Sequence, residues 1–223
     1  MPLFQGHFYL KQSSFLCPFQ TNLSMSIFFP EFFESNEYFI DQKVNFFKFH
    51  NVYNIYDPMG LQVGTVTQHV SGWHKFLRLF LKKAMFPFHL DVTDTNDRVL
   101  ASIHRGWTFW LSKITIKDGN DLVTGYIKQK FRFLKPRFRI FDASETQIAE
   151  INGNWKSWNF KITGQNEYQI GTINKKWAGL AKEFFTDADK YYVSISPEYA
   201  EDRNKMNIVV TAITIDMVLK ESK

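Results

Sequence analysis

The sequence predicts a mainly β protein, in which twelve antiparallel strands of repeated hairpins close into a barrel around a hydrophobic C-terminal helix. Three observations predict this fold. Of the 223 residues 24 are Phe, and aromatic side chains suit the pleated, half-buried surface of a sheet. A hairpin pattern recurs five times along the chain. One segment near the C-terminus is apolar in almost every direction of a helical wheel.

Each repeat consists of a short alternating strand, a turn rich in Asp, Gly or Asn, and a longer alternating strand, which is the pattern of a β-hairpin. The repeats are YNIYDPMGLQVGTVTQ from Tyr53, FHLDVTDTNDRVLASIHRGW from Phe88, ITIKDGNDLVTGYIKQKF from Ile114, FRIFDASETQIAEINGNW from Phe138 and FKITGQNEYQIGTINKKW from Phe160. Their turns contain Asp57, Asp94, Asp118, Asp142 and Gly164. Such evenly spaced short strands favour a sandwich or barrel over alternating β and α units.

Two more strands flank the repeats, at Glu37–Val44 and Lys190–Ser196, which brings the expected number to twelve. An open sheet of that size exposes two edges, so we expect closure into a barrel. The stretch KMNIVVTAITIDMVLK, Lys205–Lys220, would extend about 24 Å as a helix and is too short for the ~30 Å core of a bilayer. Its β-branched residues would also suit a strand, but a twelve-stranded barrel has an interior to fill. We therefore predict a plug helix at about 203–220, in which Asp216 needs a buried partner or marks a proton or ion site.

Residues 1–24 show no clear period and are expected to be an irregular extension, with Met25 as a candidate functional start and 25–223 as one domain. The single Cys17 excludes an intramolecular disulfide, and there is no apolar run long enough to span a bilayer. We find no Gly-rich phosphate loop, nucleophile elbow or paired His spacing, so we expect no enzyme. A cytoplasmic monomer is the expectation.

The segments KEFFTDADKYYVSI and TAITIDMVLKE, together with the repeated hairpins, resemble the phospholipid scramblase family and its relatives, the LURP-one-related proteins and the tubby C-terminal domain. The resemblance covers roughly Glu37 to Lys223. It implies a tubby-like barrel threaded by the C-terminal helix. For function it implies calcium-dependent lipid scrambling, or tethering to the inner face of a membrane by binding phosphoinositides.

The stretch KQKFRFLKPRFRIF places basic side chains on one face of two adjacent strands and mostly apolar ones on the other. The basic residues are Lys128, Lys130, Arg132, Lys135, Arg137 and Arg139. They suit inositol phosphates or anionic headgroups, at about 1 kcal/mol per residue near a membrane. The alternative is an ordinary solvated face of a strand pair. Phe131, Phe133 and Phe138 alternate away from the cations, so we do not expect nucleic acid as a partner.

A second basic candidate is the segment SGWHKFLRLFLKKAMFPF, which has the spacing of a short amphipathic helix over Trp73–Phe86. Lys75, Arg78 and Lys82 lie opposite its aromatic side. Such a helix could lie in a membrane interface, or it could pack its aromatic stripe against the barrel.

Calcium is the one cofactor that the sequence suggests, because the loop proposed for the scramblase family maps onto Asp187 to Glu198. Tyr residues at its fifth and sixth positions replace the expected oxygen ligand and Gly. If the segment is an extended strand, Asp189 and Glu198 lie roughly 30 Å apart and cannot share an ion. Asp187 and Asp189 remain as a weak candidate site completed by a neighbouring loop.

The first hypothesis is therefore a scramblase-like barrel that binds anionic phospholipid or phosphoinositide at a membrane surface and could move lipid between leaflets. The alternative is a soluble scaffold that binds protein partners and transports no lipid. The sequence does not identify a protein partner.

Overall fold

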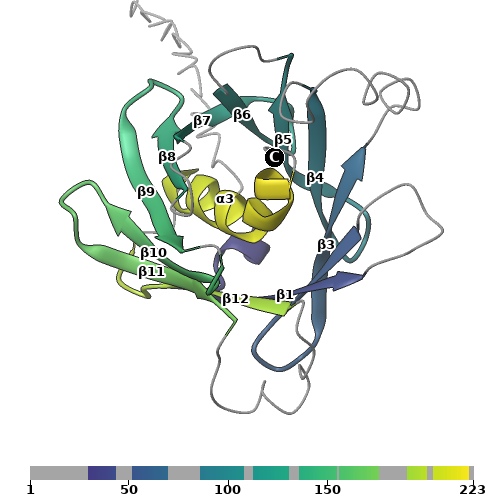
Figure 1. Ribbon diagram of the computed structural model, residues 1–223. Helices are drawn as coiled ribbons and strands as arrows, with labels where there is room; N and C mark the ends of the chain where they lie inside the picture. Colours follow the sequence, from purple (N-terminus) through teal and green to yellow (C-terminus); the bar gives the residue numbers. More distant parts are fainter. Residues whose placement is uncertain are drawn as a thin grey trace, which may run out of the picture.

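The computed structural model describes residues 30–43, 52–69, 86–107, 113–130, 136–154, 156–175, 190–199 and 203–220. Twelve antiparallel strands close into a barrel around one C-terminal helix, α3, so the predicted fold class is confirmed (Figure 1). The strands follow chain order around the ring, and β1 completes it by pairing with both β2 and β12. The extension at residues 1–24 and the candidate start Met25 lie outside the described residues.

The strands match the five repeats and their two flanking segments. They are β1 (Glu37–Lys43), β2 (Val52–Tyr56), β3 (Gln62–His69), β4 (Phe88–Asp94), β5 (Val99–Arg105), β6 (Lys113–Asp118), β7 (Val123–Lys130), β8 (Arg137–Asp142), β9 (Gln147–Asn154), β10 (Asn159–Gly164), β11 (Gln169–Asn174) and β12 (Lys190–Ile195). A short 3-10 turn, η1 (Glu31–Phe33), precedes β1, and α3 (Arg203–Lys220) follows β12.

The five repeats share one turn geometry. The N–H of the first turn residue donates to the carbonyl of the fifth, and the N–H of the fourth donates back to the carbonyl of the first. The fourth residue has a φ between 59° and 81° in every turn, namely Gly60, Asp97, Asp121, Glu145 and Glu167. Because successive strands are antiparallel, all five turns lie at the same end of the barrel, which we call the turn end.

Helix α3 fills the interior of the barrel, as Figure 1 shows in a view into the ring. Its residues from Lys205 to Leu219 are all buried, as expected of a helix that is apolar on every side, so the predicted plug helix is confirmed. Ile side chains from many strands surround it, among them Ile55, Ile103 and Ile140. At one close approach Gly125 of β7 leaves room for Asn207, whose Nδ2 would lie 2.6 Å from a Cβ at that position.

Two polar side chains of α3, Asn207 and Asp216, have hydrogen-bond partners in the strands or next to them. Asn207 donates to the carbonyl of Thr124 at 2.8 Å and accepts the Thr124 hydroxyl at 2.7 Å. Asp216 accepts a hydrogen bond from the Tyr53 hydroxyl at 2.6 Å and pairs with Lys220, whose Nζ is also 2.6 Å away. Asp216 is therefore a satisfied structural carboxylate, the first of the two alternatives.

Candidate functional site

Of the predicted basic residues, Lys128, Arg137 and Arg139 lie on the outer face of β7 and β8. Lys128 and Arg139 are directly opposite each other in the register of the two strands. The alternate residues Phe138 and Ile140 are buried inside the barrel, so the predicted separation of basic and apolar faces holds for these strands. We call Lys113, Lys128, Arg137, Arg139 and Lys161 the basic wall.

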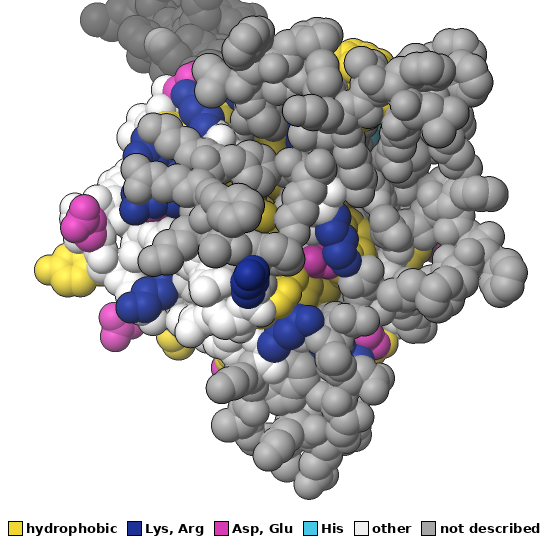
Figure 2. Space-filling model, viewed as in Figure 1, with side chains coloured by type: hydrophobic (Ala, Val, Ile, Leu, Met, Phe, Trp, Pro, Cys, Tyr) yellow, Lys and Arg dark blue, Asp and Glu magenta, His cyan; other side chains and the backbone are white. Residues whose placement is uncertain are grey.

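The wall extends beyond the predicted residues because β6 pairs with β7 on one side and β9 and β10 follow β8 on the other. Lys113 of β6 lies opposite Lys128. On the other side the register runs from Arg137 through Asn152 to Lys161 of β10. Figure 2 shows Lys and Arg side chains along the left side, over β8 to β11, with Asp and Glu side chains among them.

Two carboxylates interrupt the positive charge of the basic wall. Lys113 and Lys128 both bind Glu145, at 2.5 and 3.1 Å, and these hydrogen bonds hold the pKa of Glu145 below its ordinary value. Arg139 donates to Glu150 at 3.2 Å, and Arg137 lies 3.7 Å from the same carboxylate. Both acids come from the segment after β8, so the basic stretch itself gave no sign of them.

The other predicted site residues lie outside the described part of the chain. These are Arg132, Lys135, Lys75, Arg78, Lys82, Asp187 and Asp189, and the side chain of Lys130 in β7 is also outside it. The described part of the calcium segment consists of strand β12, as expected from its alternation, and a turn that contains Glu198, so the segment is not extended throughout. Among the described residues, no group of three or more His, Cys, Asp or Glu side chains is placed to hold a metal ion.

Charge is unequally divided between the five turns and the rest of the sequence. The turns, 57–61, 94–98, 118–122, 142–146 and 164–168, contain eight acidic residues and one basic residue, a net charge of −7. Since the whole chain carries +5, the rest of the sequence carries +12. An extended anionic surface is therefore repelled by the turn end.

The structure also brings together three histidines that sequence reasoning missed. His69, His89 and His104 lie side by side on β3, β4 and β5. The two oxygens of Asp91 lie 2.9 Å from Nε2 of His69 and 2.6 Å from Nε2 of His89. Partial burial and the neighbouring His89 lower the pKa of His104. Counting outward from the Asp94 turn would have paired His89 with Ile103, because the register shift between Val92 and Thr93 that brings His104 opposite His89 is not visible in the sequence.

The sequence profile of the Scramblase family matches residues 39–222, from within β1 through the other eleven strands to α3. The chain belongs to the Scramblase family. Among the described residues of this scramblase-family chain, no helix has the length and apolarity needed to cross a membrane.

Individual relatives are distant in sequence. A phospholipid scramblase family protein of Schizosaccharomyces pombe is 28% identical over 113 residues, or 47% of this chain and 29% of that protein. Phospholipid scramblase family member 5 of Homo sapiens is 27% identical over 120 residues, or 48% of this chain and 44% of that protein. Altered inheritance rate of mitochondria protein 25 of Saccharomyces cerevisiae is 22% identical over 193 residues, or 76% and 58%. The scramblase-family chain thus spans between 29% and 58% of these relatives.

One solved structure, of a protein from Arabidopsis thaliana, aligns with 82% of the scramblase-family chain and 91% of its own. Its TM-score is 0.47 and its sequence identity is 10%.

Proposed function

We propose that this scramblase-family barrel binds anionic phospholipid at a membrane surface through the basic wall. The division of charge carries the proposal, because the turn end has a net charge of −7 while the rest of the chain has +12. The barrel would approach an anionic bilayer sideways with the basic wall, because the acidic turns disfavour an approach with the turn end first. Electrostatic attraction of this kind is worth about 1 kcal/mol per basic residue near the surface.

Binding needs no covalent reaction by the chain. Lys113, Lys128, Arg137, Arg139 and Lys161 would act as hydrogen-bonded cations for phosphate and carboxylate oxygens of headgroups. Arg137 and Arg139 can present planar pairs of donors to one phosphate. We propose lipid movement between leaflets as a further activity of the membrane-bound barrel, in line with the names of its relatives.

A second candidate function is a scaffold for a basic protein partner, and the surface of the turn end favours it. Large apolar side chains are exposed there beside the acidic residues. They are Met59, Leu61, Val99, Leu122, Val123 and Tyr168. A partner with basic and apolar side chains would complement this surface, whereas an anionic bilayer would not.

Co-sedimentation with vesicles tests the first candidate. We expect the chain to pellet with vesicles that contain phosphatidylserine and to stay in solution with pure phosphatidylcholine, and the binding should weaken as salt is raised. The double variant Arg137→Gln/Lys161→Gln should weaken the binding by roughly thirtyfold, since two cations worth about 1 kcal/mol each are lost. Replacing Arg137 does not leave Glu150 unpaired, because Arg139 still donates a hydrogen bond to it at 3.2 Å.

A matched control removes the same charge at the turn end. Arg98→Gln/Lys117→Gln alters one turn residue and one residue beside it, which pair with Asp94 and Asp121. The control should bind vesicles like the unchanged chain. Equal losses in both double variants would show that net charge, not the basic wall, decides binding. Absence of binding to phosphatidylserine at low salt would refute the first candidate and favour the scaffold.

Lipid movement needs a separate measurement, a dye-lipid flip assay in reconstituted vesicles with and without calcium. Flipping that needs the chain would support transport. Binding without flipping would leave a membrane tether.

A further inference from the structure

The fifth hairpin turn departs from the other four at its first residue. Gly164 stands where Asp57, Asp94, Asp118 and Asp142 begin their turns. The backbone does not require a glycine there, because Gly60 is the one glycine with a positive φ in the described part of the chain. The fifth turn therefore lacks the side-chain carboxylate of the other turns, although the backbone at residue 164 would allow one.

In the other turns that carboxylate accepts hydrogen bonds from backbone N–H groups at fixed positions of the turn. Oδ1 of Asp57 accepts the N–H groups of Met59 and Leu61 at 2.8 and 2.9 Å. Asp94 and Asp118 do the same with the third and fifth residues of their turns, at 2.9 to 3.1 Å. One anionic oxygen thus takes two convergent backbone donors in each turn.

The fifth turn keeps the backbone that aims these donors. Gly164 donates to the carbonyl of Tyr168 at 2.9 Å, and Glu167 donates back to Gly164 at 3.1 Å, as in the other repeats. The equivalent donors are the N–H groups of Asn166 and Tyr168. Residue 164 offers them no side-chain oxygen, and the fifth turn carries one acidic residue, Glu167, where the turns 94–98, 118–122 and 142–146 carry two each.

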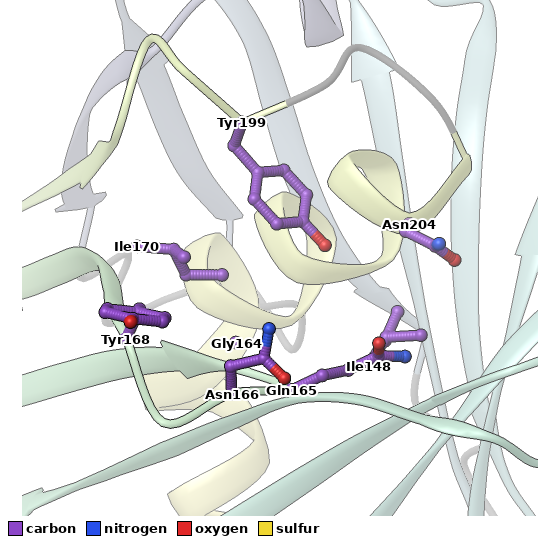
Figure 3. Close-up of a pocket in the computed structure, with 8 residues that line it drawn as sticks. All are labelled: Ile148, Gly164, Gln165, Asn166, Tyr168, Ile170, Tyr199 and Asn204. Carbon is purple, nitrogen blue, oxygen red and sulfur yellow. The ribbon is translucent and has the colours of Figure 1, made fainter.

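A pocket of about 270 Å³ opens at this turn. In Figure 3 the turn residues Gly164, Gln165 and Asn166 lie on one side, while the Tyr199 ring and Asn204 of α3 lie across from them. A Cβ at position 164 would lie 3.3 Å from Cγ2 of Ile170, which also lines the pocket. The side chain that the other turns carry would therefore enter this space.

We propose that the pocket binds a phosphate group, one oxygen of which accepts the N–H groups of Asn166 and Tyr168 in place of an Asp Oδ1. Backbone donors of this kind form anion-binding concavities in proteins. A phosphate has further oxygens for the side-chain amides of Gln165 and Asn166, and the two tyrosines leave an amphipathic rim for the rest of the molecule. The site goes beyond the basic wall and is independent of it, because none of its residues belongs to that wall.

Backbone amide signals in heteronuclear NMR report on the two donors directly. Inorganic phosphate, O-phosphoserine and a short-chain phosphatidylserine below its micelle concentration would each be titrated at constant ionic strength and pH. We expect the amide signals of Asn166 and Tyr168 to move, and those of Ser144 and Thr146 in the fourth turn to stay, because Asp142 already binds the N–H of Thr146 at 2.9 Å. Movement with the two soluble phosphates identifies a free phosphate compound, and movement with the lipid alone identifies a headgroup.

Substitutions at one position separate the oxygen from the added bulk. Gly164→Asn supplies an uncharged side-chain oxygen to the same two donors and should weaken phosphate binding about tenfold or more. Gly164→Ala adds a methyl group without an acceptor and should retain binding. Two results would overturn the site: no movement of either amide with any of the three probes, or equal losses in the Asn and Ala variants. Vesicle binding through the basic wall should survive Gly164→Asn, so failure of one proposal is distinguishable from failure of the other.

Discussion

At the scale of single residues, the best-defined polar group of the interior is the carboxylate of Asp216. It is held by Tyr53 and Lys220, and Lys220 also lies 3.0 Å from the Tyr53 hydroxyl. Burial and the charge of Asp216 raise the pKa of the nearby Tyr191 well above its ordinary value, so that hydroxyl stays protonated and donates to the carbonyl of Ile213. These contacts join the C-terminal half of α3 to β2 and β12.

We predict that Tyr53→Phe lowers the free energy of unfolding by about 1–3 kcal/mol, because a buried carboxylate loses a hydrogen-bond donor. Urea unfolding followed by circular dichroism measures the change. Tyr126→Phe is the control, since Tyr126 lies on the outer face beside Lys113, and it should change stability by less than about 0.5 kcal/mol. Equal effects of the two substitutions would show that Tyr53 does not hold Asp216.

The lowered pKa of His104 makes the stability of the folded chain depend on pH. Its folded-state pKa is lowered from the ordinary value of a histidine, first by desolvation and then by the charge of His89, so the folded state favours the neutral ring. The contribution of His104 is therefore complete above the unfolded-state pKa and is lost as pH falls through the lower folded-state pKa. In thermal unfolding between pH 7 and pH 5, His104→Gln should lose less stability on acidification than the unchanged chain. An identical pH dependence in the variant would contradict this assignment.

At the scale of elements, the hairpin turns offer a reciprocal pair of substitutions. Asp57→Ala removes the acceptor of two N–H groups and should lower the free energy of unfolding by about 1 kcal/mol. Gly164→Asp supplies the same acceptor to the fifth turn and should raise it by about 1 kcal/mol, provided Ile170 yields slightly to the new Cβ. Chemical denaturation of both variants checks the pair. A loss of stability in Gly164→Asp would mean that the five turns are not equivalent.

The elements were predictable from the sequence because a hairpin is a local pattern. Alternation and turn residues lie within one repeat, so the five hairpins, the plug helix and even the outward direction of Lys128 and Arg139 followed from short stretches. Charge partners were not predictable in this way. Glu145 and Glu150 meet the basic residues across strands, and which residues face each other depends on bulges, such as the register shift between Ile140 and Phe141.

The sequence contained a signal for the candidate phosphate site, but the structure was needed to interpret it. Gly164 already stood apart from the four Asp residues in the aligned repeats. A glycine in a turn is ordinarily explained by a left-handed backbone, however, and the conformation of residue 164 had to be seen before that explanation could be set aside. The pocket beside it depends on Tyr199 and Asn204, which come from other parts of the chain.

At the scale of the whole molecule, the barrel depends on α3 for its core. Fifteen residues of the helix are buried, from Lys205 to Leu219, and they face the apolar side chains of the strands. A chain that ends at residue 202 should therefore lose cooperative thermal unfolding, because a twelve-stranded ring without α3 leaves its inward apolar surface without a packing partner.

Circular dichroism and the dispersion of amide signals measure this loss. A synthetic peptide of residues 203–220 added in trans should restore part of the cooperative transition, whereas a peptide with Asn207→Leu, which cannot hydrogen-bond Thr124, should restore less. Cooperative unfolding of the truncated chain with an unchanged midpoint would contradict the role of α3.

The position of α3 in the chain also sets the order in which the molecule can be completed. The segment at the centre of the barrel follows all twelve strands in the sequence, and the pair that closes the ring joins β1 to β12. During synthesis from the N-terminus, hairpins can form one after another, but their inward faces stay without a core until the ribosome has released α3. The nascent chain therefore passes through a state in which its hairpins have formed but their inward apolar faces are still uncovered.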